Sequence, residues 1–136
     1  KELSPKEVLD IFQNEYVNRE DTVKLVECHF KQIDGIQAEL TILVNGEKKV
    51  YHGQGNGRLD AISNAIMKHF DIKFSLVTYE EHALQVGSDS QACAYVGLEV
   101  EGVNGIVWGA GIKSDIIDAS AYALISALNR SNHMNK

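Results

Sequence analysis

The sequence predicts an α+β fold of two pseudo-symmetric βββα units, with antiparallel strands and helices packed on one face. Three observations predict it: an internal duplication, turn signals between apolar alternating stretches, and helical periodicity after each Gly-x-Gly motif. The duplicated stretches are residues 51–66, YHGQGNGRLDAISNAI, and residues 107–124, VWGAGIKSDIIDASAYAL. Each contains an aromatic residue, Gly-x-Gly and Asp-Ala, and the second has a two-residue insertion after its glycines. A symmetric module of this kind suits binding and switching better than asymmetric chemistry.

Residues 1–20 are predicted to form a connecting helix, and residues 21–136 the folded domain. Ser4 is a helix cap, Pro5 fits the first turn, and Glu7 completes a capping box.

Unit one is predicted to span residues 21–71. Asp34-Gly35 is a turn signal, and Asn45-Gly46 is a strong hairpin signal. The predicted elements are strands at 22–33 and 36–44, a third strand through Val50 and Tyr51 into Gly53, and a helix at about 58–70.

Unit two is predicted to span residues 72–131 and to repeat this plan. Gly87-Ser88-Asp89 is a turn signal, and Asn104-Gly105 predicts a second hairpin turn. The last helix has apolar residues at helical spacing. The predicted elements are strands at about 73–86 and 91–100, a short strand IVWGAG, and a helix whose apolar face holds Ile116, Ala119, Ala123, Leu124, Ala127 and Leu128.

The composition excludes several classes of protein. The 136 residues fit one domain, and the net charge of −6 with scattered lysines argues against nucleic-acid binding. No apolar run approaches the roughly 20 residues that cross a membrane. Cys28 and Cys93 lie in apolar alternating stretches and are expected to be buried thiols. Without a visible signal peptide, we expect a reducing, cytoplasmic setting, and the missing start methionine suggests a piece of a longer protein.

The glycine-rich stretch at residues 53–57 is the first candidate site. Its glycines allow positive φ and a close approach of a ligand to the backbone. The N-terminus of the following helix is a natural seat for a carboxylate or phosphate. The alternative is a tight β–α turn without a ligand, because the spacing matches neither a Walker motif nor a dinucleotide fingerprint. Gly109-Ala110-Gly111 could be a degenerate twin of this site.

A second candidate is the acidic pair Glu80-Glu81 beside His82, which invites an acid–base or metal interpretation. On a strand, Glu80 and His82 would share one face, and Tyr79 and Glu81 the other. No further ligands stand at a useful spacing, so we expect no catalytic residue and no metal site here.

Three motifs together resemble a known family over about residues 20–131. They are GQGNGRLDAISNAI, YEEHALQVGSDSQACAYV and VWGAGIKSDIIDASAYALISALNR. The chain resembles the C-terminal regulatory domain of 2-isopropylmalate synthase, also called the LeuA allosteric or dimerisation domain. The resemblance implies two βββα units at a homodimer interface and leucine as a feedback inhibitor. It also implies a parent enzyme that joins acetyl-CoA to 2-oxoisovalerate in a TIM barrel with a divalent metal. That barrel is not part of this chain, so no activity and no cofactor are expected in it.

The resemblance also implies a leucine pocket. Backbone N–H groups near the helix start would receive the carboxylate, and Asp60 or Asp89 could meet the ammonium group. Small alanines would leave room for a branched side chain. The implied residues are Gly55, Asn56, Gly57, Leu59, Asp60, Tyr79, Ala83, Ser90, Ala92 and Ile112.

Three alternatives remain open from the sequence. The first is the isoleucine-responsive regulatory domain of citramalate synthase, from the same superfamily. The second is a small acid–base enzyme that uses Glu80, Glu81 and His82. The third is a dimerisation module without a ligand.

Overall fold

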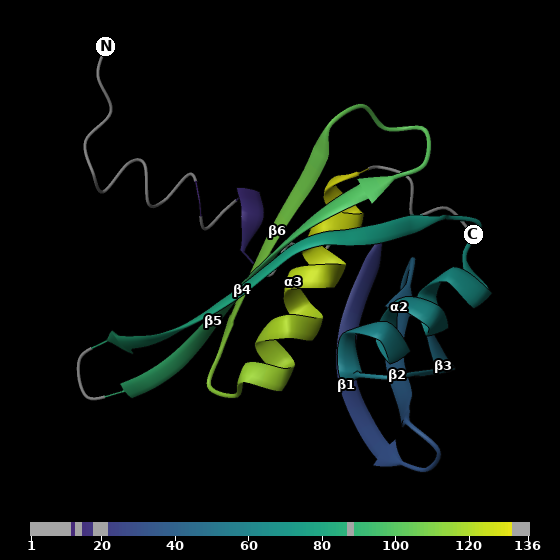
Figure 1. Cartoon of the computed structure of the whole chain (residues 1–136), viewed down its shortest axis with the longest axis horizontal. Helices are drawn as coiled ribbons and strands as arrows, with labels where there is room; N and C mark the ends of the chain where they lie inside the picture. Colours follow the sequence, from purple (N-terminus) through teal and green to yellow (C-terminus); the bar gives the residue numbers. More distant parts are fainter. Residues whose placement is uncertain (1–11, 13–14, 18–21, 87–88, 132–136) are drawn as a thin grey trace.

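Two three-stranded antiparallel sheets, each followed by one helix, make up the fold (Figure 1). The computed structural model describes Phe12 and residues 15–17, 22–86 and 89–131. The elements run βββα twice, so the predicted α+β class is confirmed. Their bounds are β1 Val23–Gln32, β2 Ile36–Val44, β3 Glu47–Gly55, α2 Arg58–His69, β4 Phe74–Val86, β5 Asp89–Val100, β6 Ile106–Lys113 and α3 Ile116–Arg130.

The connecting helix predicted for residues 1–20 lies mostly outside the described residues. Phe12 and Tyr16 have helical backbone, and Val17 forms an isolated parallel bridge with Ala110 of β6. The described part of this segment therefore lies against the second sheet.

The two turns of the first sheet confirm the sequence signals. Asn45 and Gly46 join β2 to β3 with φ values of 52° and 84°, which is the type I′ geometry that Asn-Gly favours. Asp34 and Gly35 also have positive φ, at 48° and 97°, between β1 and β2. The β2–β3 hairpin thus has the register that its turn residues predict, with Val44 opposite Glu47. The β1–β2 turn lies where it was predicted, but Gln32 pairs with Ile36, so its loop has three residues, and β1 ends one residue before the predicted bound.

The second sheet departs from the prediction at its β5–β6 connection. The prediction of a two-residue turn at Asn104-Gly105 is wrong, because a five-residue loop separates the strands. Its positive φ values belong to Gly102 (90°) and Gly105 (80°), and the Val103 N–H donates to the Val100 carbonyl at 3.0 Å. Two glycines, and not Asn-Gly, shape this loop.

The β4–β5 hairpin is only partly described. Residues 87 and 88 of its predicted turn lie outside the described residues, and Val86 pairs with Asp89 across them. Away from the turn, β4 has a register shift between Leu76 and Thr78, as β1 has between Leu25 and Glu27. The duplication therefore repeats a bulge as well as the order of elements.

Glycines in β3 and β6 let each helix lie directly on the strand backbone. A Cβ on Gly53 would overlap the backbone of Ala61 and Ala65, and one on Gly109 would overlap the backbone of α3. The expectation of positive φ is wrong, since no glycine within the described residues 53–57 has it. Gly-x-Gly followed by spaced alanines is thus a signature of close strand–helix packing.

Helix α3 lies between the second sheet and β1, at the centre of the molecule (Figure 1). The predicted apolar face packs on β5 and β6, but burial extends around the helix because β1 covers another side. The Asn129 side chain accepts from the Val23 N–H at 3.2 Å and donates to the Val23 carbonyl at 2.8 Å. Tyr122 Oη donates to the Leu25 carbonyl at 2.9 Å, so side chains of α3 bind the two units together. Neither described helix combines the length and apolarity needed to span a membrane.

Candidate functional site

A pocket opens where the two units meet, between the start of α2, the middle of β4 and the start of α3. Its volume is about 370 Å³, within the range of small-molecule sites. The packing of the two units brings the starts of their equivalent helices to this one place. The lining residues are Gly57, Arg58, Leu59, Asp60, Ile62, Tyr79, Glu81, Ile116, Ile117 and Ser120.

The two helix starts differ in how they are capped. Helix α3 has Asp115, whose Oδ1 accepts from the N–H groups of Ile117 at 2.7 Å and Asp118 at 3.4 Å. Helix α2 begins after Gly57, and no described side chain caps it. The first N–H groups of a helix need partners, and they form a positive end. The start of α2 can therefore receive an anionic group from a ligand.

A hydrogen-bonded chain of side chains crosses the pocket from β4 to α3. Tyr79 Oη donates to Glu81 Oε2 at 2.7 Å and lies 2.6 Å from Ser120 Oγ. Ser120 Oγ donates to the Ile116 carbonyl at 2.8 Å. Burial raises the pKa of Tyr79, the bond to Ser120 lowers it, and Glu81 raises it, with a net upward shift. The Tyr79 hydroxyl therefore remains protonated near neutral pH and can hold Glu81 in position.

A second hollow of about 420 Å³ adjoins the first. Glu81 and Ile116 line both, so the two hollows are neighbours along β4 and the start of α3. The remaining lining residues of the second hollow are His82, Ala83, Ser90, Gln91, Ala92 and Ser114.

Seven of the ten residues implied by the resemblance line these two hollows. The first hollow contains four of them and the second contains three. In chain order they are Gly57, Leu59, Asp60, Tyr79, Ala83, Ser90 and Ala92.

The other three implied residues line neither hollow. A Cβ on Gly55 would lie 2.6 Å from Asp60 Cβ, so Gly55 is a close-packing position under α2. Asn56 is exposed. Ile112 pairs with Cys93, on the face of the second sheet opposite the glycines that pack on α3. Strand alternation thus separates Ile112 from the hollows within this chain.

Sequence reasoning missed the contribution of the second helix. Ile116, Ile117 and Ser120 line the first hollow, together with Ile62 of α2. The duplication is the sequence feature that could have indicated these residues, because it makes the start of the second helix equivalent to the start of the first. Glu81 was noticed only as part of an acid–base cluster.

The strand divides that acid–base cluster, as alternation predicts. Glu80 Oε1 lies 3.8 Å from His82 Nε2 on one face, and Glu81 bonds to Tyr79 on the other. The side chains of Glu80 and His82 are more than half exposed. Within the described residues, no group of three His, Cys, Asp or Glu side chains could hold a metal ion. The three residues therefore do not form a closed acid–base site.

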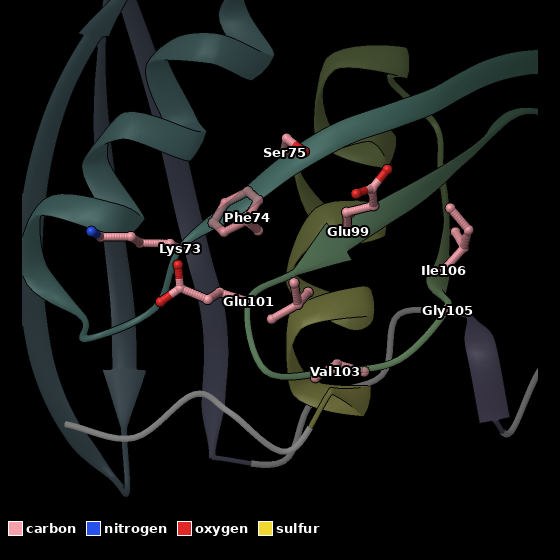
Figure 2. A pocket seen from close by; sticks show the side chains of 9 residues that line it. Lys73, Phe74, Ser75, Glu99, Glu101, Val103, Gly105 and Ile106 are labelled. Atoms are coloured by element: carbon pink, nitrogen blue, oxygen red, sulfur yellow. The ribbon is translucent and has the colours of Figure 1, made fainter.

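A further hollow lies elsewhere, beside the β5–β6 loop (Figure 2). It measures about 600 Å³ and is lined by Lys73, Glu99, Glu101 and apolar neighbours. The side chains of Lys73 and Glu99 extend in different directions, so its charged groups do not converge. None of the residues implied by the resemblance lines it.

Fold and pocket together define the class: a duplicated α+β domain with a small-molecule-sized pocket at the start of its first helix. The model of the LeuA allosteric (dimerisation) domain matches residues 2–132. The chain belongs to the LeuA allosteric domain family.

Its relatives are similar over nearly the whole chain. A 2-isopropylmalate synthase of Desulfitobacterium hafniense is 48% identical over 130 residues, which is 95% of this chain and 23% of that protein. That of Helicobacter hepaticus is 44% identical over 139 residues, with coverages of 96% and 25%. That of Corynebacterium efficiens is 38% identical over 133 residues, with coverages of 95% and 22%. The chain thus spans about a quarter of the length of these relatives.

Proposed function

We propose that this chain is the leucine-binding regulatory domain of a 2-isopropylmalate synthase. The parent enzyme would join acetyl-CoA to 2-oxoisovalerate, and leucine bound here would inhibit it. Family membership and the names of the relatives support the parent activity. Support for an amino-acid ligand comes from the pocket.

The observation that carries the proposal is the uncapped start of α2 beside an apolar wall. The N–H groups after Gly57 offer a seat for an α-carboxylate. Leu59, Ile62, Ile116 and Ile117 line the same pocket and offer apolar contact to a branched side chain. A carboxylate at one end and an aliphatic group at the other is the chemistry of leucine.

The catalytic chemistry is proposed to belong to a TIM barrel elsewhere in the parent protein. This chain would have no synthase activity and would bind its ligand without a metal or other cofactor. Chelator should therefore leave leucine binding unchanged. Both thiols are free, which suits the reducing cytoplasm that we propose as the setting.

We also propose that the chain forms a homodimer, with neither nucleic acid nor membrane as a partner. The family description as a dimerisation domain supports this. Closed two-fold association is the commonest form of homo-oligomer. Light scattering at tens of micromolar should give the mass of two chains, and a monomer mass with and without leucine would contradict it.

Calorimetry tests the ligand. Leucine should bind more tightly than isoleucine or valine, and tighter binding of isoleucine would favour the citramalate synthase alternative. Gly57→Val should weaken leucine binding by blocking the helix start. No atom lies within 4 Å of a Cβ at Gly57, so the fold should tolerate this variant. Gln37→Val adds a valine at an exposed position on β2 and is the matched control.

The neighbouring hollow gives a second test. Ala92→Trp should fill the space beside Glu81 and abolish leucine binding. In the full parent enzyme, the same change should leave synthase activity intact and remove inhibition by leucine. Normal inhibition of that variant would exclude the second hollow from the site.

A further inference from the structure

Glu81 lies on β4, across the pocket from the start of α2. Tyr79 Oη donates to its Oε2 at 2.7 Å. Its other oxygen, Oε1, has no hydrogen-bond partner within the described part of the chain. The carboxylate is therefore held in place through one oxygen and can accept from a ligand through the other.

Glu81 also differs from several other acidic residues on the strands. Glu27, Glu39 and Glu80 each have a histidine nitrogen within 3.1–3.8 Å. Among the described residues, no cationic side chain lies within ion-pair distance of Glu81. Arg58 also lines the pocket but makes no ion pair with Glu81, so the carboxylate can pair with a ligand that brings a cation.

We propose that Glu81 binds the α-ammonium group of the amino acid whose carboxylate occupies the start of α2. This inference rests on the proposed function. Tyr79 and Ser120 are positioning residues, since they act on the ligand through Glu81. The proton on Tyr79 is donated toward Glu81, so the carboxylate remains an acceptor for the ammonium group.

Asp60 is the other candidate that the pocket offers. It belongs to the first turn of α2, so its carboxylate lies at the positive end that the ligand carboxylate would occupy. Glu81 lies on a different element, so the carboxylate and the ammonium group of the ligand can bind on opposite sides of the pocket. The side chain of Asp89 is outside the described part of the structure.

If Glu81 binds the ammonium group, the pocket distinguishes an amino acid from the 2-oxo acid of the same carbon skeleton. Both have a carboxylate and a branched chain, but only the amino acid has a cation. A 2-oxo acid would leave Glu81 unpaired beside a second carboxylate, which costs binding free energy. The domain should therefore respond to the finished amino acid and ignore its oxo precursor.

Calorimetry with L-leucine and 4-methyl-2-oxopentanoate tests this inference. Wild type should bind leucine and discriminate strongly against the oxo acid. Glu81→Gln should lose about tenfold to a hundredfold in leucine affinity, the range expected for a hydrogen bond to a charged group. Its discrimination between the two ligands should shrink by a similar factor. Glu80→Gln, one residue away on the opposite face, is the matched control and should bind leucine like wild type.

Further variants separate the possible failures. Asp60→Asn should keep the discrimination, and Tyr79→Phe should reduce it less than Glu81→Gln does. If Glu81→Gln binds leucine as tightly as wild type, the inference is wrong and the proposed function stands. If Asp60→Asn alone loses the discrimination, Asp60 holds the ammonium group and the inference is overturned. If wild type binds no leucine, both fail. Asp60, Glu80 and Glu81 are exposed, and Tyr79→Phe removes only a hydroxyl group, so thermal unfolding should show all variants folded.

Discussion

Cys28 shows how burial changes the chemistry of one residue. Burial, and then the charge of Asp118, raise the pKa of the Cys28 thiol from 9.0 to about 12. Burial also raises the pKa of Cys93. Because the thiolate is the reactive form, both residues should be unreactive in the folded protein. The sequence predicted their burial from apolar alternation. The structure confirms it for Cys93, while Cys28 is only partly buried against the core.

Alkylation with iodoacetamide at pH 8.5 should be slow for Cys28 in the folded chain and fast in urea. The folded pKa lies above the unfolded one, so the protonated thiol favours folding below pH 9. This contribution to stability should disappear as the pH rises from 9 to 12. Mass spectrometry of labelled peptides follows the reaction, and rapid labelling of Cys28 without denaturant would contradict the burial.

At the scale of elements, hairpins were predictable where local chemistry decides the backbone. Asn45-Gly46 favours positive φ at both positions, and the chain adopts it. Asn104-Gly105 is the same dipeptide, but the pairing of β5 with β6 leaves a five-residue loop at this position. The bulges at Val26 and Val77 were also not predictable, since alternation assigns every apolar residue to a face. Both valines are about half exposed, at 50% and 48%.

Substitution of Gly53 by alanine should destabilise the domain by about 1–3 kcal/mol or more, because its Cβ would overlap the backbone of α2. Gly57→Ala is the matched control, since its Cβ meets nothing and its φ is −137°. Its cost should be at most about 1 kcal/mol. Urea unfolding measures both, and equal stability of the two variants would refute the packing role of Gly53.

At the scale of the whole molecule, the two units were predictable but their contact was not. The duplication predicts two equivalent units, and repetition alone says nothing of how they meet. Asn129 decides this by bonding to both backbone groups of Val23, at a separation of 106 residues. The same limit applies to the site. The motifs predicted the pocket residues at the start of α2 and on β4. Ile116 and Ser120 belong to the pocket only because the two units pack together.

Replacement of Asn129 by alanine should lower the free energy of unfolding by about 2–4 kcal/mol, because buried backbone groups of Val23 would lose their partners. Asn64→Ala removes one exposed bond to the Gln54 carbonyl and should cost at most about 1 kcal/mol. Denaturant unfolding compares them. A neutral Asn129 variant would show that apolar packing alone joins the units.

The Asp115 cap has a consequence for stoichiometry. Two equivalent helices would suggest two ligand molecules per chain. In the second unit, however, the chain supplies its own carboxylate, which occupies the place that an anionic ligand would take. The duplication has thus doubled the scaffold without doubling the capacity, and a titration should saturate at one molecule per chain.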